Sequence, residues 1–215
     1  FRRVLFRSSN AAASTRGIVV MKISLSDDLR TERYLRYILL LALCLRLYGL
    51  TAFSLSNDEL SALSRLRFSG FHDLIEKGVV VDFHPAGTQV FLYYWTRLFG
   101  ISEWMVRLPF ALMGVISVWL LFLIGRKWFG NATGLMAAAS MATLSFPLLY
   151  SQIARPYSPG LMATLAAVWF WSNLIFDDAS DRSRIKNAAG FILSVSACMY
   201  IHYFSFIFEI GRAHV

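Results

Sequence analysis

Cysteines and charged residues are both scarce in this chain. Of its 215 residues only two are cysteines, and Asp, Glu, Lys and Arg together make up 16%. Two cysteines in apolar runs, with no metal-ligand spacing around them, exclude a disulfide framework and a cysteine-rich metal site. The low charge excludes an ordinary soluble domain, in which about a quarter of the residues are charged. The chain is instead 57% hydrophobic and 15% aromatic, a composition that predicts a membrane protein.

Nucleotide and metal motifs are also absent from the sequence. There is no G-x-G-x-x-G, no P-loop and no H-E-x-x-H. Asp177, Asp178 and Asp181 lie close together, but Arg182 and Lys186 follow them, and a solvated loop is the preferred interpretation. We therefore expect no nucleotide-activated donor and name no metal ligands. The cofactor is left unknown, with an assisting divalent cation as an open alternative.

The formal net charge of +8 arises in part from the two ends of the chain. Residues 209–215 resemble the translation of a sequencing adapter, and residues 4–8 resemble the same adapter read from the opposite strand. We interpret residues 1–20 as a non-native or disordered flank and 209–215 as a non-native tail, with Met21 as the natural start. Residues 21–208 are then the first part of a longer transmembrane domain. The remaining basic residues flank apolar segments, so we expect no nucleic-acid partner.

Several apolar segments have the length of a transmembrane helix, which needs about 20 residues. The segment 88–100 is shorter and carries three interfacial aromatics, so we interpret it as a juxtamembrane or re-entrant helix. Leucines at helical spacing predict a second, surface-lying helix over residues 58–77. The predicted fold is all-α, a polytopic membrane protein with two juxtamembrane helices in the first outer loop. Its five predicted spans are residues 34–53, 104–124, 131–150, 157–176 and 188–208.

The distribution of basic residues indicates which loops face outward. If 88–100 does not span, the cytoplasmic side receives most of the flanking Lys and Arg, and the opposite face gathers four polar residues. If it did span, the basic cluster 182–186 would lie outside, against the positive-inside rule. The outer set is Asp58, His84, Arg107 and Arg155. One further arginine, Arg46, interrupts the first span, and we expect it to snorkel to the interface, with contact to a lipid phosphate as the alternative.

Two adjacent carboxylates, Asp58 and Glu59, directly follow the first predicted span. They are consistent with a helix start, in which Ser56 is the N-cap and Glu59 completes a capping box. They are also consistent with a catalytic carboxylate at the membrane face. The two interpretations are compatible, because a cap fixes the geometry that a general base needs. We expect Asp58 to be the base and Glu59 to be its capping or hydrogen-bonding support.

The other outer residues are suited to an anionic substrate. An arginine such as Arg155 can bind a phosphate through two parallel hydrogen bonds. Considered singly, Arg155 is equally consistent with a helix-flanking anchor, and His84 with a polar turn residue before proline. Their predicted position beside Asp58 on one face favours a shared site.

Five motifs occur in a fixed order along the chain. Asp58-Glu59 follows the first span, His84-Pro85 begins the short helix, and the segments 102–109 (SEWMVRLP), 125–130 (GRKWFG) and 150–158 (YSQIARPYS) follow. Together they resemble the N-terminal part of bacterial GT-C glycosyltransferases. The most similar group is glycosyltransferase family 39, the dolichyl-phosphate-mannose protein mannosyltransferase-like enzymes, with the lipid A aminoarabinose transferase as a cousin. The resemblance covers roughly residues 34–208.

The resemblance implies a sugar donor on a polyprenyl phosphate, attacked outside the bacterial cytoplasmic membrane by a hydroxyl of a lipid, glycan or protein. It implies that Asp58 is the base, with Glu59 beside it. The implied substrate-binding residues are His84, Arg107, Arg155 and Tyr157. The sequence departs from the pattern at Ala86, where a second proline is usual, and the cousin has lysine where His84 stands. The family's C-terminal helices are missing, so we expect this chain alone to be inactive.

The competing functional hypothesis is a polytopic transporter or lipid flippase without glycosyl transfer. Such proteins usually carry ionisable residues near the bilayer midplane. The centres of the second, third and fourth predicted spans are uncharged. A scaffold without chemistry would explain the spans but not the outer cluster. The pattern therefore favours an interfacial enzyme.

Overall fold

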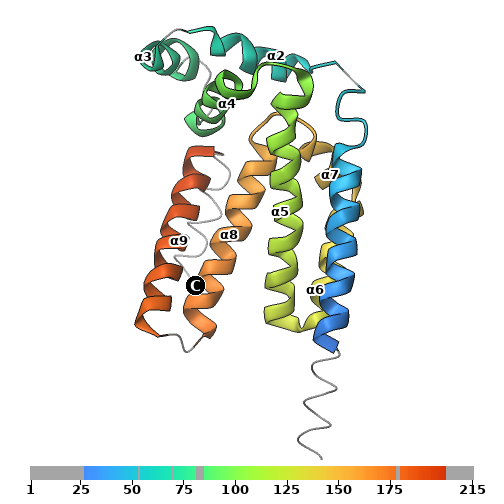
Figure 1. Ribbon diagram of the computed structural model, residues 1–215. Helices are drawn as coiled ribbons and strands as arrows, with labels where there is room; N and C mark the ends of the chain where they lie inside the picture. The colour runs from blue at the N-terminus through green and yellow to red at the C-terminus, as the bar shows by residue number, and fades with distance from the viewer. Residues whose placement is uncertain (1–26, 53, 69, 81–84, 178–179, 202–215) are drawn as a thin grey trace, which may run out of the picture.

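The computed structural model describes residues 27–52, 54–68, 70–80, 85–177 and 180–201, and the regular elements in these ranges are all helical. Long helices stand side by side, and shorter ones lie across one end of them (Figure 1). The first helix, residues 27–47, is followed by a turn and then by the crossing layer. This layer consists of α2 (Asn57–Ser64), α3 (Phe71–Asp73), which continues as a π-helix (Leu74–Val79), and α4 (Ala86–Phe99).

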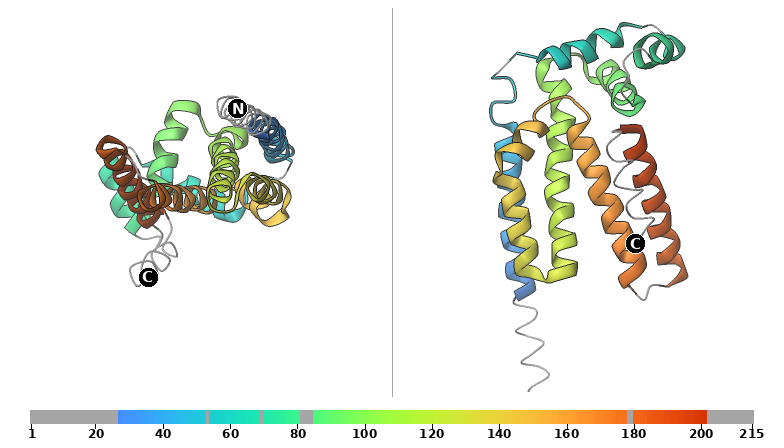
Figure 2. Two further views of the ribbon diagram at one scale, coloured as in Figure 1. Left: turned by 90° about the horizontal axis from the view of Figure 1, so that it is seen from below. Right: turned by 180° about the vertical axis from the view of Figure 1, so that it is seen from behind.

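The long helices form an open row rather than a closed bundle (Figure 2). In this row α5 (Glu103–Phe129) packs on α8 (Tyr157–Phe176), and α8 packs on α9 (Asp181–Ile201). On its other side α5 packs on α6 (Asn131–Thr143), which is followed by the short α7 (Ser145–Ser151). The first helix joins this side, because its Ala42 is buried with Val118 of α5 and Ala138 of α6.

Small residues allow the closest helix contacts. A Cβ on Gly134 would lie 2.8 Å from the backbone N of Arg126, so α5 and α6 touch backbone to backbone. A Cβ on Gly190 would lie 2.6 Å from the ring of Phe170, so α9 packs closely on α8 there, and a larger residue would have to displace that ring. Close approach through small residues is the usual way in which helices pack inside a membrane.

The all-α membrane fold is confirmed. Both α5 and α8 are long and apolar enough to cross a membrane, and the pair α6–α7 passes the same test as one broken unit. The described residues thus offer two or three candidate spans, against the five predicted. The first helix and α9 are not among these candidates, and both carry several charged residues. The predicted fifth span also continues past residue 201, outside the described residues.

The segment 131–150, predicted as one straight span, is broken at Leu144. The two halves, α6 and α7, meet at an angle of 60°, and Leu144 has the extended torsions φ −60° and ψ 132°. The cause is Pro147. A continuous helix would press its ring against the carbonyl of Thr143 and would leave that carbonyl without a donor.

The prediction that Arg46 snorkels is wrong, because its side chain lies inside the protein with 1% of its surface exposed. Its Nη2 donates to the carbonyl of Met141 (3.2 Å), and its Nη1 donates to the carbonyl of Ala142 (3.4 Å). These carbonyls have no helical partner, since α6 stops at Thr143. Glycine at position 114 leaves space for the Arg46 side chain, because a Cβ there would lie 2.8 Å from Arg46 Nε. Arg46 therefore caps the broken helix.

The crossing layer differs from the single surface helix predicted over residues 58–77. The helical conformation is lost around Phe68 and Gly70, which have extended torsions, and it resumes at Phe71. By contrast, α4 is one continuous helix within this layer, and it covers most of the segment 88–100 that was predicted as a short helix. Gln89 Nε2 donates to the carbonyl of Ala62 (2.8 Å), and this hydrogen bond joins α4 to α2.

Candidate active site

The capping box predicted at the start of α2 is confirmed. Ser56 Oγ accepts a hydrogen bond from the backbone N of Glu59 (3.3 Å), and Ser56 N donates to Glu59 Oε2 (2.9 Å). Reciprocal bonds of this kind satisfy two backbone donors that a helix start otherwise leaves unpaired. The box fixes the orientation of the first turn of α2, which carries both acidic side chains.

Glu59 is buried and forms an ion pair with Arg107 of α5. Arg107 Nε donates to Oε1 (2.9 Å) and Nη2 donates to Oε2 (2.7 Å), a two-pronged contact. The backbone N of Ala154 also donates to Oε1 (2.9 Å). Burial alone raises the pKa of Glu59, but the hydrogen bonds from Arg107, Ala154 and Ser56 outweigh it and hold the pKa below its ordinary value. Glu59 is thus a fully bonded carboxylate that joins α2, α5 and the turn after α7.

The guanidinium of Arg107 also holds the loop between the first helix and α2. Its Nη1 donates to the carbonyl of Leu50 (2.7 Å), and its Nη2 donates to the carbonyl of Ser54 (3.1 Å). With 6% of its surface exposed, Arg107 lies behind the site and not at its surface. The structure therefore places this predicted substrate-binding residue in the supporting framework.

The turn between α7 and α8 is held from several sides. Gln152 Nε2 donates to the carbonyls of Arg46 (3.1 Å) and Tyr48 (2.9 Å), so its amide caps the end of the first helix. Ser158 Oγ, at the start of α8, donates to the carbonyl of Phe110 (2.7 Å) in α5. Together with the bond from Ala154 to Glu59, these contacts position the segment that carries Arg155.

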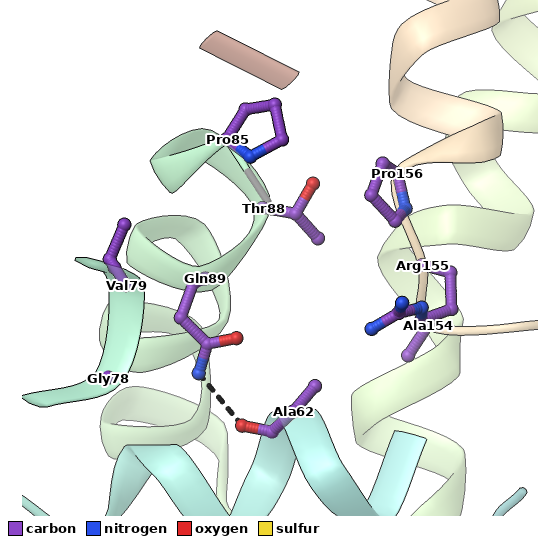
Figure 3. Close-up of a pocket in the computed structure, with 9 residues that line it drawn as sticks. All are labelled: Ala62, Gly78, Val79, Pro85, Thr88, Gln89, Ala154, Arg155 and Pro156. Carbon is purple, nitrogen blue, oxygen red and sulfur yellow. Dashed lines mark hydrogen bonds between the residues drawn. The ribbon is translucent and has the colours of Figure 1, made fainter. Parts of the chain in front are cut away.

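Arg155 lies at a pocket between the crossing layer and this turn (Figure 3). The pocket is a small hollow that is partly open to solvent. In Figure 3 the guanidinium of Arg155 points toward Gln89 and Ala62 across the pocket. The lining residues are Ala62, Gly78, Val79, Pro85, Thr88, Gln89, Ala154, Arg155 and Pro156.

Two buried polar atoms at this pocket have no hydrogen-bond partner among the described residues. They are Nε of Arg155 and Oγ1 of Thr88. A buried polar group left unsatisfied costs about 1–3 kcal/mol, so native proteins rarely keep one without a reason. Reasoning from sequence missed Thr88. The available signal was a hydroxyl in the first turn of a short, largely apolar helix.

Asp58 lies next to this pocket and not in its wall. Its side chain is exposed, and within the described part of the chain no hydrogen bond or ion pair engages it. Because residues four apart share a helix face, Asp58 lies one turn before the pocket residue Ala62 on the same side of α2. The carboxylate is therefore free to meet a substrate that enters beside α2.

The remaining predicted site residues have different positions. Tyr157 begins α8 two residues after Arg155, and its ring packs edge-on against Tyr150 with centroids 4.6 Å apart. His84 lies outside the described residues, directly before Pro85, which lines the pocket. No group of three or more His, Cys, Asp or Glu side chains that could hold a metal occurs in the described ranges.

A protein-family model agrees with these features. The model described as dolichyl-phosphate-mannose-protein mannosyltransferase matches residues 83–211, more than half of the chain. The matched segment includes Arg107, Arg155 and Tyr157, whereas Asp58 and Glu59 precede it. No curated protein and no solved structure matches the chain.

Proposed function

This chain belongs to the dolichyl-phosphate-mannose-protein mannosyltransferase family, and we propose that it transfers a sugar from a polyprenyl-phosphate donor to an acceptor hydroxyl at the outer face of a bacterial cytoplasmic membrane. Membership by itself makes the protein a membrane glycosyltransferase that uses lipid-linked sugar donors. The membrane face, the acceptor class (lipid, glycan or protein) and the residue roles below are parts of the proposal.

The observation that carries the proposal is the pocket at Arg155. Among the described residues that line the pocket, the guanidinium of Arg155 is the only charged group, and its Nε has no hydrogen-bond partner there. A planar guanidinium matches the oxygens of a phosphate and stays protonated at physiological pH. We assign Arg155 to the donor phosphate. As the sugar leaves, the phosphate gains negative charge, and a cation fixed beforehand beside it stabilises that charge.

Asp58 is assigned the role of general base. The acceptor hydroxyl gives its proton to the Asp58 carboxylate, and its oxygen bonds to the anomeric carbon of the sugar. The bond from that carbon to the phosphate oxygen breaks, and polyprenyl phosphate departs with the electron pair. A single displacement of this kind inverts the anomeric configuration. General-base assistance is typically worth about 10²–10⁴-fold in rate.

Glu59 and Arg107 support this arrangement. Their ion pair connects α2, which carries Asp58, to α5, and the Ala154 N–H bond to Glu59 connects both to the turn that carries Arg155. The two acidic neighbours thus have different environments: Glu59 is buried and bonded, whereas Asp58 is exposed. This difference supports Asp58 as the base and Glu59 as the residue that positions it.

A charged residue inside the helix row is the feature that a transporter would be expected to show. Arg46 is such a residue, but its guanidinium bonds to the last carbonyls of α6. Its position is explained by helix capping, so it gives the transporter hypothesis no specific support.

The test uses the full-length protein in membranes, with a polyprenyl-phosphate sugar as donor. Asp58→Asn is expected to abolish transfer while donor binding survives, and Arg155→Ala is expected chiefly to raise the KM for the donor. Arg67→Ala and Asp73→Asn are the controls, since both residues are charged and lie on the same crossing layer, Arg67 exposed and Asp73 partly exposed in an ion pair with Lys77. Turnover by Asp58→Asn close to that of Asp73→Asn would contradict the assignment of the base.

A further inference from the structure

Thr88 differs from the other helical hydroxyls around it. On the same helix, Thr96 Oγ1 donates to the carbonyl of Leu92 (2.8 Å), the usual way in which a threonine satisfies its hydroxyl inside a helix. Thr88 Oγ1 is buried and makes no such bond. Its side chain lies at the pocket, on the α4 side, while Arg155 approaches from the turn before α8 (Figure 3).

We propose that Thr88 is a second binding residue for the donor, and that its hydroxyl donates to a phosphoryl oxygen of the phosphate held by Arg155. The inference rests on the proposed function, because the same pocket is taken to receive the lipid-linked phosphate. A hydroxyl can donate or accept a hydrogen bond, whereas a guanidinium can only donate. A phosphate has several acceptor oxygens, so one phosphate beside Arg155 can accept a hydrogen bond from the guanidinium and another from the Thr88 hydroxyl.

The lining of the pocket favours a phosphate over the sugar itself. No carboxylate is among the described residues that line the pocket, and their only charge is positive. One of the two N–H groups of the Gln89 amide is already used, because it donates to the carbonyl of Ala62. Val79, Pro85, Ala154 and Pro156 complete a mostly apolar wall. A sugar presents several hydroxyls that need both donors and acceptors, and these walls offer few acceptors.

The position of Thr88 on its helix agrees with this choice. Thr88 is the third residue of α4, whose N-cap is Pro85 and whose first turn has no side-chain cap. The first turn of a helix carries partial positive charge from its free N–H groups and favours a nearby anion. Thr88 thus adds a directed donor where the backbone already favours negative charge.

The decisive measurement is binding of polyprenyl monophosphate, which carries no sugar, to the full-length protein in detergent or nanodiscs. Thr88→Val removes the hydroxyl at almost constant volume and is expected to weaken binding about tenfold, which corresponds to about 1.4 kcal/mol. Thr88→Ser keeps the hydroxyl and is expected to bind within about twofold of the unmodified protein. Thr96→Val is the matched control, because its hydroxyl bonds to its own helix, and it is expected to change nothing.

Competition by inorganic phosphate distinguishes recognition of the phosphate from recognition of the lipid chain. Thr88→Val is expected to lower the affinity for both ligands by a similar factor. An unchanged affinity in Thr88→Val would overturn the proposal, and so would an equal loss in Thr96→Val. Loss for the lipid but not for inorganic phosphate would also overturn it, since Thr88 would then contact the chain.

The same variants in the transfer assay separate this inference from the proposed function. Thr88→Val is expected to raise the KM for the donor about tenfold with little change in kcat, because the hydroxyl contributes to ground-state binding. If the unmodified protein binds polyprenyl monophosphate through Thr88 but transfers no sugar, the proposed function fails and the phosphate contact stands. If transfer occurs and Thr88→Val has an unchanged KM, only the role of Thr88 fails.

Discussion

Removal of either partner of the Glu59–Arg107 ion pair should destabilise the protein far more than removal of a surface charge. The side chains are 0% and 7% exposed, so whichever partner remains is left as a buried charge with no counter-charge. Breaking a buried pair from one side typically costs about 3–5 kcal/mol. A protein of ordinary stability has about 5–15 kcal/mol in total, so the loss is a large fraction.

The size of the effect should depend on the replacement. Glu59→Gln keeps an oxygen that can still accept one of the bonds from Arg107 or Ala154, so its cost should lie near the lower end of that range. Glu59→Ala also orphans the backbone N–H groups of Ser56 and Ala154 and should reach the upper end. Arg107→Met should resemble Glu59→Ala, because it frees the carbonyls of Leu50 and Ser54 as well.

Denaturant titration of the purified protein measures these differences, with Asp73→Asn as a partly exposed control. The combined variant Glu59→Gln with Arg107→Met should cost clearly less than the sum of its two single changes, because neither charge is then left alone. Simple additivity of the two changes would refute the reasoning, and so would a Glu59→Gln protein as stable as Asp73→Asn. In either case the pair would contribute no more than a surface contact.

Three further predictions follow from the same geometry. Folding lowers the pKa of Glu59, so its negative charge stabilises the folded protein above the unfolded pKa of about 4.3. This stabilisation is lost as the pH falls through the lower pKa of the folded state. Thermal melts below pH 5 should therefore show an acid-dependent loss of stability that a Glu59→Gln protein lacks. Gly114→Ala would place a Cβ 2.6 Å from the Cβ of Ser151 and 2.8 Å from Arg46 Nε. Denaturant titration should show that it lowers the free energy of unfolding by about 1–3 kcal/mol. Gly70→Ala is the control and should be nearly neutral, because its Cβ would lie 3.9 Å from the nearest atom. Gln152→Ala should raise proteolytic cleavage after the first helix, because its amide no longer caps Arg46 and Tyr48, and unchanged cleavage would count against that role.

Local signals in the sequence were sufficient for the features that depend on neighbouring residues. The capping box at Ser56 is a four-residue pattern, and the structure contains both of its hydrogen bonds. The spans predicted over 104–124 and 157–176 correspond to α5 and α8, because continuous apolar length determines them. The break at Leu144 also had a local signal in Pro147, which the prediction of one straight span overlooked.

Features that join distant parts of the chain could not be predicted in this way. Arg46 was expected at the interface because an isolated arginine in an apolar run usually snorkels. Its actual acceptors, the carbonyls of Met141 and Ala142, lie 95 and 96 residues away and become available only because α6 ends early. Likewise, nothing local indicated that Glu59 would bond to Arg107, 48 residues away. The unsatisfied hydroxyl of Thr88 becomes visible only once the pocket around it is known.

The break in α6–α7 gives these distant contacts a common logic. Because α6 ends early, its last carbonyls are free to accept hydrogen bonds from Arg46 of the first helix. In the other direction, Gln152 in the turn after α7 donates to a carbonyl at the end of the first helix. Two helix ends thus cap each other through side chains exchanged between them. The residue two positions after Gln152, Ala154, is bonded to Glu59, and the next is Arg155, which reaches the pocket. A straight helix over 131–150 would free no carbonyls for Arg46, and its end would carry Gln152 and Arg155 away from these partners. The bend at Leu144 is therefore what brings Arg155 to the layer that carries Asp58.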